Sequence, residues 1–447
     1  MEQRTKIIIG VAAAAAVTLI VVLVIALTGR PKTNGPKTES PPPPKPETIN
    51  LTMWGLFDDR EVFRPLIEDY EAENPKIKIT YKKMDPATYE KDVTDAIASE
   101  NAPDIWLIHN DWLPKHLKKL EPMPQPYMSL QTLADTFAPV VMDDLVSGGR
   151  IYGLPLFMET LALFYNTDIF YNAKISNPPQ TWDEFITIVK ELVRREGNDQ
   201  IVMAGAALGT ANNIPRAVDI LYTLMLQNMQ ERIGMTSDDH INATFNQYVD
   251  IAGQPYYPGT VALDFYTSYA RPNKETYTWN STLPDATTAF SQGKAAMMFG
   301  YSYMIPTILR LAPNLKFDIV PVPQIKGAEK QVTLANYWAW TVSKQSKNKD
   351  EAWKFLLYLT SKEVASMYKG FTNRPPARLD VAGVGGRYYS AFTNQLKIAR
   401  SWYKGEANQV DKIFSDTITN VVQYNQTPQS ALDAAARLVG EILKIYQ

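Results

Sequence analysis

A glutamate inside an apolar run is the first residue of this sequence whose chemistry needs an explanation. The stretch GLPLFMETLALFYN, residues 153–166, is dominated by aliphatic and aromatic side chains, and Glu159 is its one carboxylate. An ionised carboxylate among such residues is costly unless a cation pairs with it or water reaches it. We therefore expect Glu159 to face a polar site. An exposed position or a pair with an arginine is the alternative.

Two further groups of acidic and aromatic residues follow predicted strands. Residues 54–59, WGLFDD, end the strand-like stretch INLTMWGL, and residues 109–112, HNDW, follow PDIWLI. Ligands of parallel α/β sheets bind beyond the C-terminal ends of the strands. Both groups are therefore candidates for a ligand site.

Motifs for catalysis are mostly missing from the sequence. The GKA at residues 293–295 lacks the Ser or Thr of a Walker A motif, there is no GxSxG, and His109, His116 and His240 form no HExxH pair. With no cysteine there is no thiolate site. We predict no enzyme, no cofactor and no metal. A carboxylate pair for glycoside hydrolysis stays open, because its spacing is a three-dimensional property.

The elements that must position these residues alternate between strands and helices. Residues 49–56, 76–84 and 103–108 have strand patterns, and helical patterns at 60–75 and 88–100 separate them. This order predicts a parallel sheet with right-handed crossovers. A further helix is predicted over 181–197, with Thr181 as N-cap, Glu184 in a capping box and Gly197 as its stop. Residues 229–285 have weak periodicity and receive no assignment.

Length and charge restrict the class of protein. At 447 residues the chain exceeds one simple core and predicts two lobes or domains. The formal net charge is -2, and no long basic run is present. Nucleic acid is therefore not expected as a partner, because a phosphate backbone requires clustered Lys and Arg.

The N-terminus indicates a membrane anchor. Residues 7–28 are uncharged and apolar, and as a helix they would extend about 33 Å, enough to cross a bilayer core. The run exceeds the apolar centre of a usual signal peptide, so an uncleaved anchor over 1–28 is expected, with a cleaved signal peptide as the alternative. Residues 29–48 are rich in proline and predict an extended linker that holds the domain outside the membrane.

Five stretches in order resemble one family. They are residues 149–170, 178–185, 289–303, 320–323 and 346–363. Together they resemble the extracellular solute-binding proteins of ABC importers, in the group that contains maltodextrin-binding and other sugar-binding proteins. The resemblance implies an α/β, two-lobed periplasmic-binding-protein fold of type II, the Venus-flytrap form, with a ligand cleft between the lobes. Lobe 1 is expected at 49–158 plus 340–375, and lobe 2 at 159–339 plus 376–447.

The resemblance also implies roles for individual residues. Glu159 corresponds to a ligand-contacting glutamate at the edge of a crossing segment, and Asp58 and Asp111 correspond to sugar-contacting aspartates. Asp59 and Trp112 replace a lysine and an arginine of the family pattern, which puts the charge preference in doubt. The expected ligand-binding residues are Trp54, Asp58, Asp59, Asp111, Trp112, Glu159, Tyr301, Tyr303, Trp338 and Trp402.

The implied function is capture of a carbohydrate by hinge closure and its delivery to an ABC transporter permease. We expect a monomer at the cell membrane, with its soluble domain extracellular or periplasmic. Because four of the expected site residues are carboxylates, a neutral or cationic ligand is favoured. The alternatives are a membrane-tethered glycan hydrolase and a sensory binding subunit of the same fold.

Overall fold

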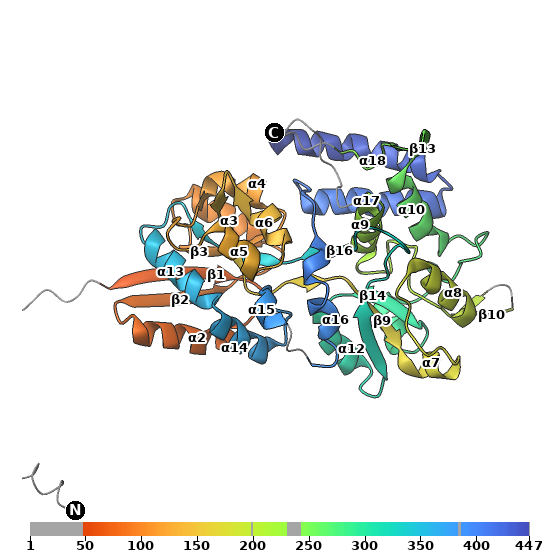
Figure 1. Cartoon of the computed structure of the whole chain (residues 1–447), viewed down its shortest axis with the longest axis horizontal. Helices are drawn as coiled ribbons and strands as arrows, with labels where there is room; N and C mark the ends of the chain where they lie inside the picture. Colours follow the sequence, from red (N-terminus) through yellow and green to blue (C-terminus); the bar gives the residue numbers. More distant parts are fainter. Residues whose placement is uncertain (1–47, 198–199, 230–242, 383–385, 447) are drawn as a thin grey trace, which may run out of the picture. The chain divides into compact units, whose positions relative to one another are not determined.

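Two separate hydrophobic cores organise the chain, as a computed structural model shows. The structure describes residues 48–197, 200–229, 243–382 and 386–446, and Thr48–Gln447 is one compact unit. The predicted anchor lies outside the described residues, as does all of the linker except Thr48. No helix within the described part is long and apolar enough to span a bilayer. We call the elements around the first core lobe 1 and those around the second core lobe 2 (Figure 1).

Lobe 1 is built on a sheet with the strand order β2-β1-β3-β17-β4, and β7 also pairs with β17. β1 pairs in parallel with both β2 and β3, so the predicted parallel arrangement is confirmed. β17 then runs antiparallel to β3. The strands of this sheet are β1 (Ile49–Gly55), β2 (Ile77–Lys83), β3 (Ile105–His109), β4 (Leu120–Glu121), β7 (Leu154–Pro155) and β17 (Trp338–Ser343). In the same lobe β5 (Val146–Ser147) and β6 (Arg150–Ile151) form a separate two-stranded sheet.

The longer helices of lobe 1 bury apolar side chains in the lobe 1 core. In α2, Phe63, Leu66, Ile67 and Tyr70 are buried, as helical spacing requires. Gly55 at the end of β1 is required by close packing, since a Cβ there would lie 2.6 Å from the ring of Tyr81. The helices are α2 (Arg60–Glu73), α3 (Tyr89–Ala98), α4 (Leu113–His116), α5 (Leu130–Thr136), α6 (Val140–Leu145), α13 (Lys349–Leu359), α14 (Lys362–Thr372) and α15 (Leu379–Ala382).

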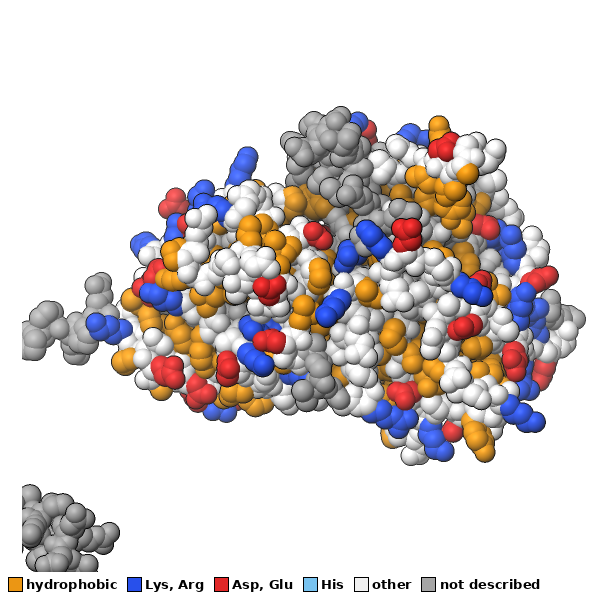
Figure 2. Space-filling model, viewed as in Figure 1, with side chains coloured by type: hydrophobic (Ala, Val, Ile, Leu, Met, Phe, Trp, Pro, Cys, Tyr) orange, Lys and Arg blue, Asp and Glu red, His pale blue; other side chains and the backbone are white. Residues whose placement is uncertain are grey.

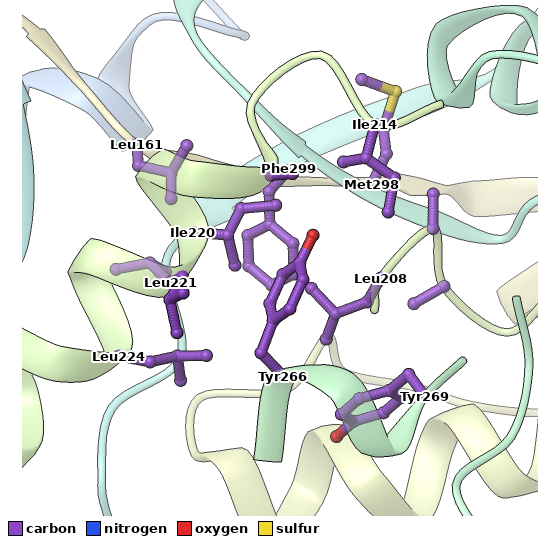
Figure 3. Close-up of a cluster of buried hydrophobic side chains, with 14 of the residues drawn as sticks. Leu161, Leu208, Ile214, Ile220, Leu221, Leu224, Tyr266, Tyr269, Met298 and Phe299 are labelled. Carbon is purple, nitrogen blue, oxygen red and sulfur yellow. The ribbon is translucent and has the colours of Figure 1, made fainter. Parts of the chain in front are cut away.

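Lobe 2 contains an antiparallel sheet with the order β14-β9-β15 and a helical layer. Figure 3 shows side chains of α9 and α10, among them Ile220, Leu224 and Tyr266, packed with Met298 and Phe299 of β14. Its strands are β9 (Ala162–Asn166), β10 (Arg194–Glu196), β11 (Gln200–Met203), β12 (Val249–Ile251), β13 (Gln254–Tyr256), β14 (Met297–Gly300) and β15 (Phe317–Pro321). Its helices are α7 (Thr167–Asn172), α8 (Trp182–Leu192), α9 (Ala217–Asn228), α10 (Pro258–Ser268), α11 (Ala286–Ser291), α12 (Ile305–Leu311), α16 (Ser390–Thr393), α17 (Ala407–Gln423) and α18 (Pro428–Leu443).

Three short strands form a sheet where the chain passes between the lobes. β8 (Glu159–Thr160), β16 (Thr333–Asn336) and β18 (Ala399–Arg400) pair in the order β18-β16-β8. Core membership changes at β8 between Met158 and Leu161, and within β16 between Leu334 and Ala335. We call this sheet the crossing sheet. The lobe boundaries expected from the sequence remain a prediction. The expected end of lobe 1 at residue 375 lies two residues before Ala377, a member of the lobe 1 core.

Candidate functional site

A cavity of about 440 Å³ is lined by side chains of both lobes and of the crossing sheet. Its size lies within the range of about 300–1,000 Å³ typical of small-molecule sites. It is lined from lobe 1 by Phe57, His109, Trp112, Phe157, Trp338 and Arg374, from the crossing sheet by Glu159 and Asn336, and from lobe 2 by Arg216, Asp219, Tyr303, Lys404, Ala407, Asn408 and Asp411.

Lobe 1 gives the cavity a group of aromatic rings. Trp338 begins β17, and its ring centroid lies 5.0 Å from that of Trp112 in an edge-to-face arrangement. Phe57 packs edge-on against Trp338 at 5.9 Å and is 39% exposed. Its φ of 65° is unusual for a residue with a large side chain and marks a turn that surrounding contacts must hold. These rings offer flat apolar faces to a ligand.

Glu159 is only 3% exposed but lines the cavity from β8. Its Oε2 accepts a hydrogen bond from the backbone N–H of Ser302 at 2.8 Å, and its Oε1 accepts one from the Ser302 hydroxyl at 2.7 Å. Burial raises the pKa of Glu159, while Ser302, Arg374 and Arg216 oppose that rise. These contacts therefore offset part of the cost of burying the carboxylate.

Asp58 does not line the cavity itself, but it pairs with Arg374, which does. Its Oδ1 lies 3.1 Å from Nη2 of Arg374, and its Oδ2 accepts a hydrogen bond from the Tyr368 hydroxyl at 2.6 Å. The guanidinium of Arg374 also lies over the ring of Phe157, at 4.5 Å. Both oxygens of Asp58 are thus engaged, and the group that lines the cavity is the arginine.

Asp111 likewise contacts two residues that line the main cavity, His109 and Lys404. Its Oδ1 contacts Nδ1 of His109, and its Oδ2 lies 3.6 Å from Nζ of Lys404, with no hydrogen bond to it. Burial opposes ionisation, but His109 and Lys404 hold the pKa of Asp111 at about 2. His109 and Lys404 line the main cavity, whereas Asp111 lines a smaller pocket of about 20 Å³ beside it.

Lobe 2 contributes a third pair of opposite charges. Arg216 precedes α9 and forms an ion pair with Asp219, whose Oδ2 also accepts a hydrogen bond from the Tyr301 hydroxyl at 2.7 Å. Tyr301 is fully buried, and Tyr303 stacks on it at 5.7 Å while remaining 47% exposed. Burial raises the pKa of Tyr303 to about 12, so its hydroxyl stays protonated and can donate a hydrogen bond.

Four of the expected ligand-binding residues line the main cavity: Trp112, Glu159, Tyr303 and Trp338. The other six do not. Asp58, Asp111 and Tyr301 lie behind it as described. Trp54 lies under Lys82, 4.7 Å from its Nζ, and Asp59 is paired with Lys83, its side chain 78% exposed. Trp402 is buried in the lobe 2 core with its ring 5.1 Å from that of Tyr222.

The expectation of a predominantly acidic cleft is wrong. Arg216, Arg374 and Lys404 line the cavity together with Glu159, Asp219 and Asp411. Sequence reasoning missed these cations because they lie far apart in the chain and in no shared motif. One signal could have found Arg374: it directly precedes Pro375 and Pro376, and two successive prolines mark a turn or loop rather than a helix.

The aromatic rings of the site can therefore pack on apolar faces of a ligand, and its polar side chains can both donate hydrogen bonds to the ligand and accept them from it. Among the described residues no cluster of three or more His, Asp or Glu side chains is placed to hold a metal ion, and the chain has no cysteine. Arg216, Arg374 and Lys404 supply donors, and Asp219 and Asp411 supply acceptors. This is binding chemistry for a polar molecule that has apolar faces.

Comparisons with known proteins agree with this architecture. Residues 55–366 match the model of the family described as bacterial extracellular solute-binding protein. A binding protein of Brucella abortus is 27% identical over 398 residues, covering 86% of this chain and 90% of that protein. The multiple sugar-binding protein of Streptococcus mutans is 22% identical over 372 residues, and the match covers 81% of this chain and 83% of that protein. The solved structure of the sugar-binding protein MalE from Xanthomonas citri has a TM-score of 0.71 at 23% identity, and the match covers 89% of this chain and 98% of that one.

Proposed function

The chain belongs to the family of bacterial extracellular solute-binding proteins, and from this we propose that it is the carbohydrate receptor of an ABC importer. It captures an uncharged sugar, preferably a short oligosaccharide, in the cavity between its lobes. It then presents the loaded form to the permease subunits of the transporter. The names of similar proteins, such as the multiple sugar-binding protein of Streptococcus mutans, support a sugar as the ligand.

The observation that carries this proposal is the combination of aromatic rings and paired charges in one cavity. The C–H faces of a sugar pack on rings such as those of Trp112, Trp338 and Tyr303. Its hydroxyls both donate and accept, and the cavity offers cationic donors and carboxylate acceptors. Because each cation already has a carboxylate partner, the site gains little from an additional charge on the ligand.

The energies are sufficient for useful affinity. A hydrogen bond to a charged group contributes about 1.5–3 kcal/mol before ordering costs are subtracted. A few of these together with stacking reach roughly -8 kcal/mol, which corresponds to a micromolar Kd. A ligand that contacts both lobes favours the closed form by its differential affinity for it.

The N-terminal sequence and the surface charge indicate where the receptor acts. The apolar run 7–28 anchors the chain in the membrane, and the proline-rich segment 29–48 holds the binding domain in the extracellular or periplasmic space near the permease. On the face drawn in Figure 2, Lys and Arg side chains are interspersed with Asp and Glu, which is not the basic surface that nucleic acid requires. One chain supplies both sides of the cavity, which supports a receptor that acts as a monomer.

A screen with the purified chain tests this function. Thermal shifts are recorded with neutral mono- and oligosaccharides, with uronic acids and with polyamines, and hits are measured by titration calorimetry. We expect a neutral oligosaccharide to raise the melting temperature and to be recovered unchanged. Cleavage products would instead identify a hydrolase, and a response to polyamines or uronic acids alone would overturn the assignment of a neutral sugar.

A further inference from the structure

The three cations that line the cavity differ in how their carboxylate partners are placed. Arg374 pairs with Asp58 within lobe 1, and Arg216 pairs with Asp219 within lobe 2. Lys404 belongs to lobe 2, where it lies 3.3 Å from Oδ1 of Asp411, but it also lies 3.6 Å from Oδ2 of Asp111 in lobe 1. Among these three cations, Lys404 is therefore the one whose ion pairs join the lobes.

Lys404 is part of a short segment that contacts lobe 1 repeatedly. The Ser401 hydroxyl donates a hydrogen bond to Asp144 of α6. Nζ of Lys115, on α4, lies 2.7 Å from Oε1 of Glu406. We call residues 401–406 the strap. It leaves the crossing sheet after β18 and enters α17, whose Asn408 and Asp411 also line the cavity.

We propose that Lys404 is a positioning residue that couples occupation of the cavity to closure of the two lobes. This inference rests on the proposed receptor function and names the group through which that function operates. The side chain of Lys404 is 11% exposed and that of Asp111 is 3% exposed. The ammonium group therefore touches the ligand cavity on one side and a buried carboxylate of the opposite lobe on the other.

The coupling follows from the dependence of ion pairs on water. In an open form the two partners separate and are hydrated, whereas in the arrangement seen here they are only 11% and 3% exposed and attract each other, so the pair favours closure even without a ligand. A ligand in the cavity displaces water beside Lys404, which lowers the local dielectric constant and strengthens its attraction to Asp111. Closure then stabilises the bound ligand, and by linkage the ligand stabilises closure by the same factor.

The distance between the lobes can be measured in the full-length protein without any ligand. The chain has no cysteine, so Asp69→Cys on α2 and Tyr171→Cys on α7 place one spin label on each lobe at exposed positions. Pulsed electron resonance then gives the distribution of distances. We expect Lys404→Met to broaden the distribution and shift it to longer distances, and Lys404→Arg to restore it. The matched control is Lys412→Met, which removes a surface ion pair with Asp416 on the same α17.

Ligand binding provides the second measurement. With a sugar from the screen, we expect Lys404→Met to raise Kd about tenfold through faster dissociation, within the usual range of coupling between sites. Lys412→Met should leave Kd unchanged. If Lys404→Met does not fold, the double variant Lys404→Met with Asp111→Asn removes both charges together and is expected to show the same longer distances.

The outcomes separate the two proposals. An unchanged distance distribution in Lys404→Met or in the double variant overturns the role of Lys404, even if the wild-type protein binds sugar. A wild-type protein that binds none of the sugars overturns the receptor function, while the distances still test whether Lys404 holds the lobes together. Equal effects of Lys404→Met and Lys412→Met would mean a general effect of charge and would also overturn the inference.

Discussion

Glu159 and Ser302 are joined by two hydrogen bonds, one from the backbone and one from the side chain of the serine, so both oxygens of the glutamate are engaged. Ser302 immediately precedes Tyr303, which also lines the cavity. The glutamate on the crossing sheet therefore fixes the turn that presents a lobe 2 aromatic ring to the ligand. The apolar residues on either side of Glu159 belong to the two cores, Met158 to that of lobe 1 and Leu161 to that of lobe 2.

The contact between Ser302 and Glu159 should matter for both stability and binding. Ser302→Ala removes one donor from a buried carboxylate and should lower the free energy of unfolding by about 1–3 kcal/mol. It should also weaken sugar binding, because Tyr303 loses its support. Denaturant unfolding and calorimetry measure the two effects. The control is Ser366→Ala, whose exposed hydroxyl bonds only within its own helix and should change stability by less than about 0.5 kcal/mol. Equal stabilities of the two variants would contradict the prediction.

The neighbouring aspartates Asp58 and Asp59 should respond very differently to loss of charge. Asp58→Asn leaves the partly buried Arg374 without its anion and should destabilise the protein by about 3–5 kcal/mol, with loss of sugar affinity. Asp59→Asn removes an exposed pair with Lys83 and should cost at most about 1 kcal/mol. Thermal unfolding of the two variants side by side checks this. Similar melting temperatures would mean that Asp58 does not hold Arg374.

Two exposed tyrosines of lobe 2 provide a matched test of the aromatic surface. Tyr303 is 47% exposed and lines the cavity, whereas Tyr171 is 81% exposed on α7 and does not line it. Tyr303→Ala should reduce sugar affinity by about 1–3 kcal/mol, or 5- to 150-fold, and leave the fold intact. Tyr171→Ala should leave Kd unchanged. Unaltered binding by Tyr303→Ala would exclude a stacking role for this ring.

Asp144 should make stability depend on pH. Burial raises its pKa to about 7, against hydrogen bonds from Ser401, Tyr337 and Asn110 that favour its ionised form. Because the folded-state pKa exceeds that of the unfolded chain, the protonated group favours folding fully below about pH 4. That contribution is lost as pH rises to about 7.

Asp144→Asn provides the comparison for this effect. Relative to the variant, the wild-type free energy of unfolding should fall by at most about 4 kcal/mol between pH 4 and 7 and stay level above it. Asp143→Asn, at the exposed adjacent position, is the control. A difference between wild type and Asp144→Asn that does not vary with pH would refute the assignment.

The membrane anchor is tested by removing it. The full chain should sediment with membranes and be released by detergent but not by high salt, because an apolar span of residues 7–28 inserts into the bilayer core. A chain that begins at Thr48 should stay in the supernatant. Release of the full chain by salt alone, or a mature N-terminus after residue 28, would instead support the cleaved signal peptide.

Secondary structure was predictable where local patterns dominate. The capping box of Thr181 and Glu184 is present as predicted, because it depends only on residues three apart. The end of that helix is wrong: α8 stops at Leu192, and Arg194–Glu196 form β10, which pairs with β11. A contact with a later strand overrides the local helical preference of this segment, and Gly197 instead lies in the turn between the two strands.

The candidate site was only partly predictable for the same reason. Aromatic and acidic residues after β1 and β3 could be located, because strand ends are visible in the sequence pattern. What those carboxylates contact was not visible, since Arg374 lies 316 residues from Asp58 and Lys404 lies far beyond Asp111. These long-range pairs set the charge of the cavity. The residues near strand ends alone therefore predict too many negative side chains and none of the positive ones.

The pairing of β8, β16 and β18 has a mechanical consequence. Three crossings joined by backbone hydrogen bonds cannot twist one by one, because twisting any strand alone would strain the ladder to its neighbour. The crossing sheet therefore resists twisting and bends most easily about a line that runs across its strands. We therefore expect the two lobes to rotate about one common axis that passes through the crossing sheet. Even a small substitution in β16, the middle strand, would alter the resistance of the sheet to this rotation.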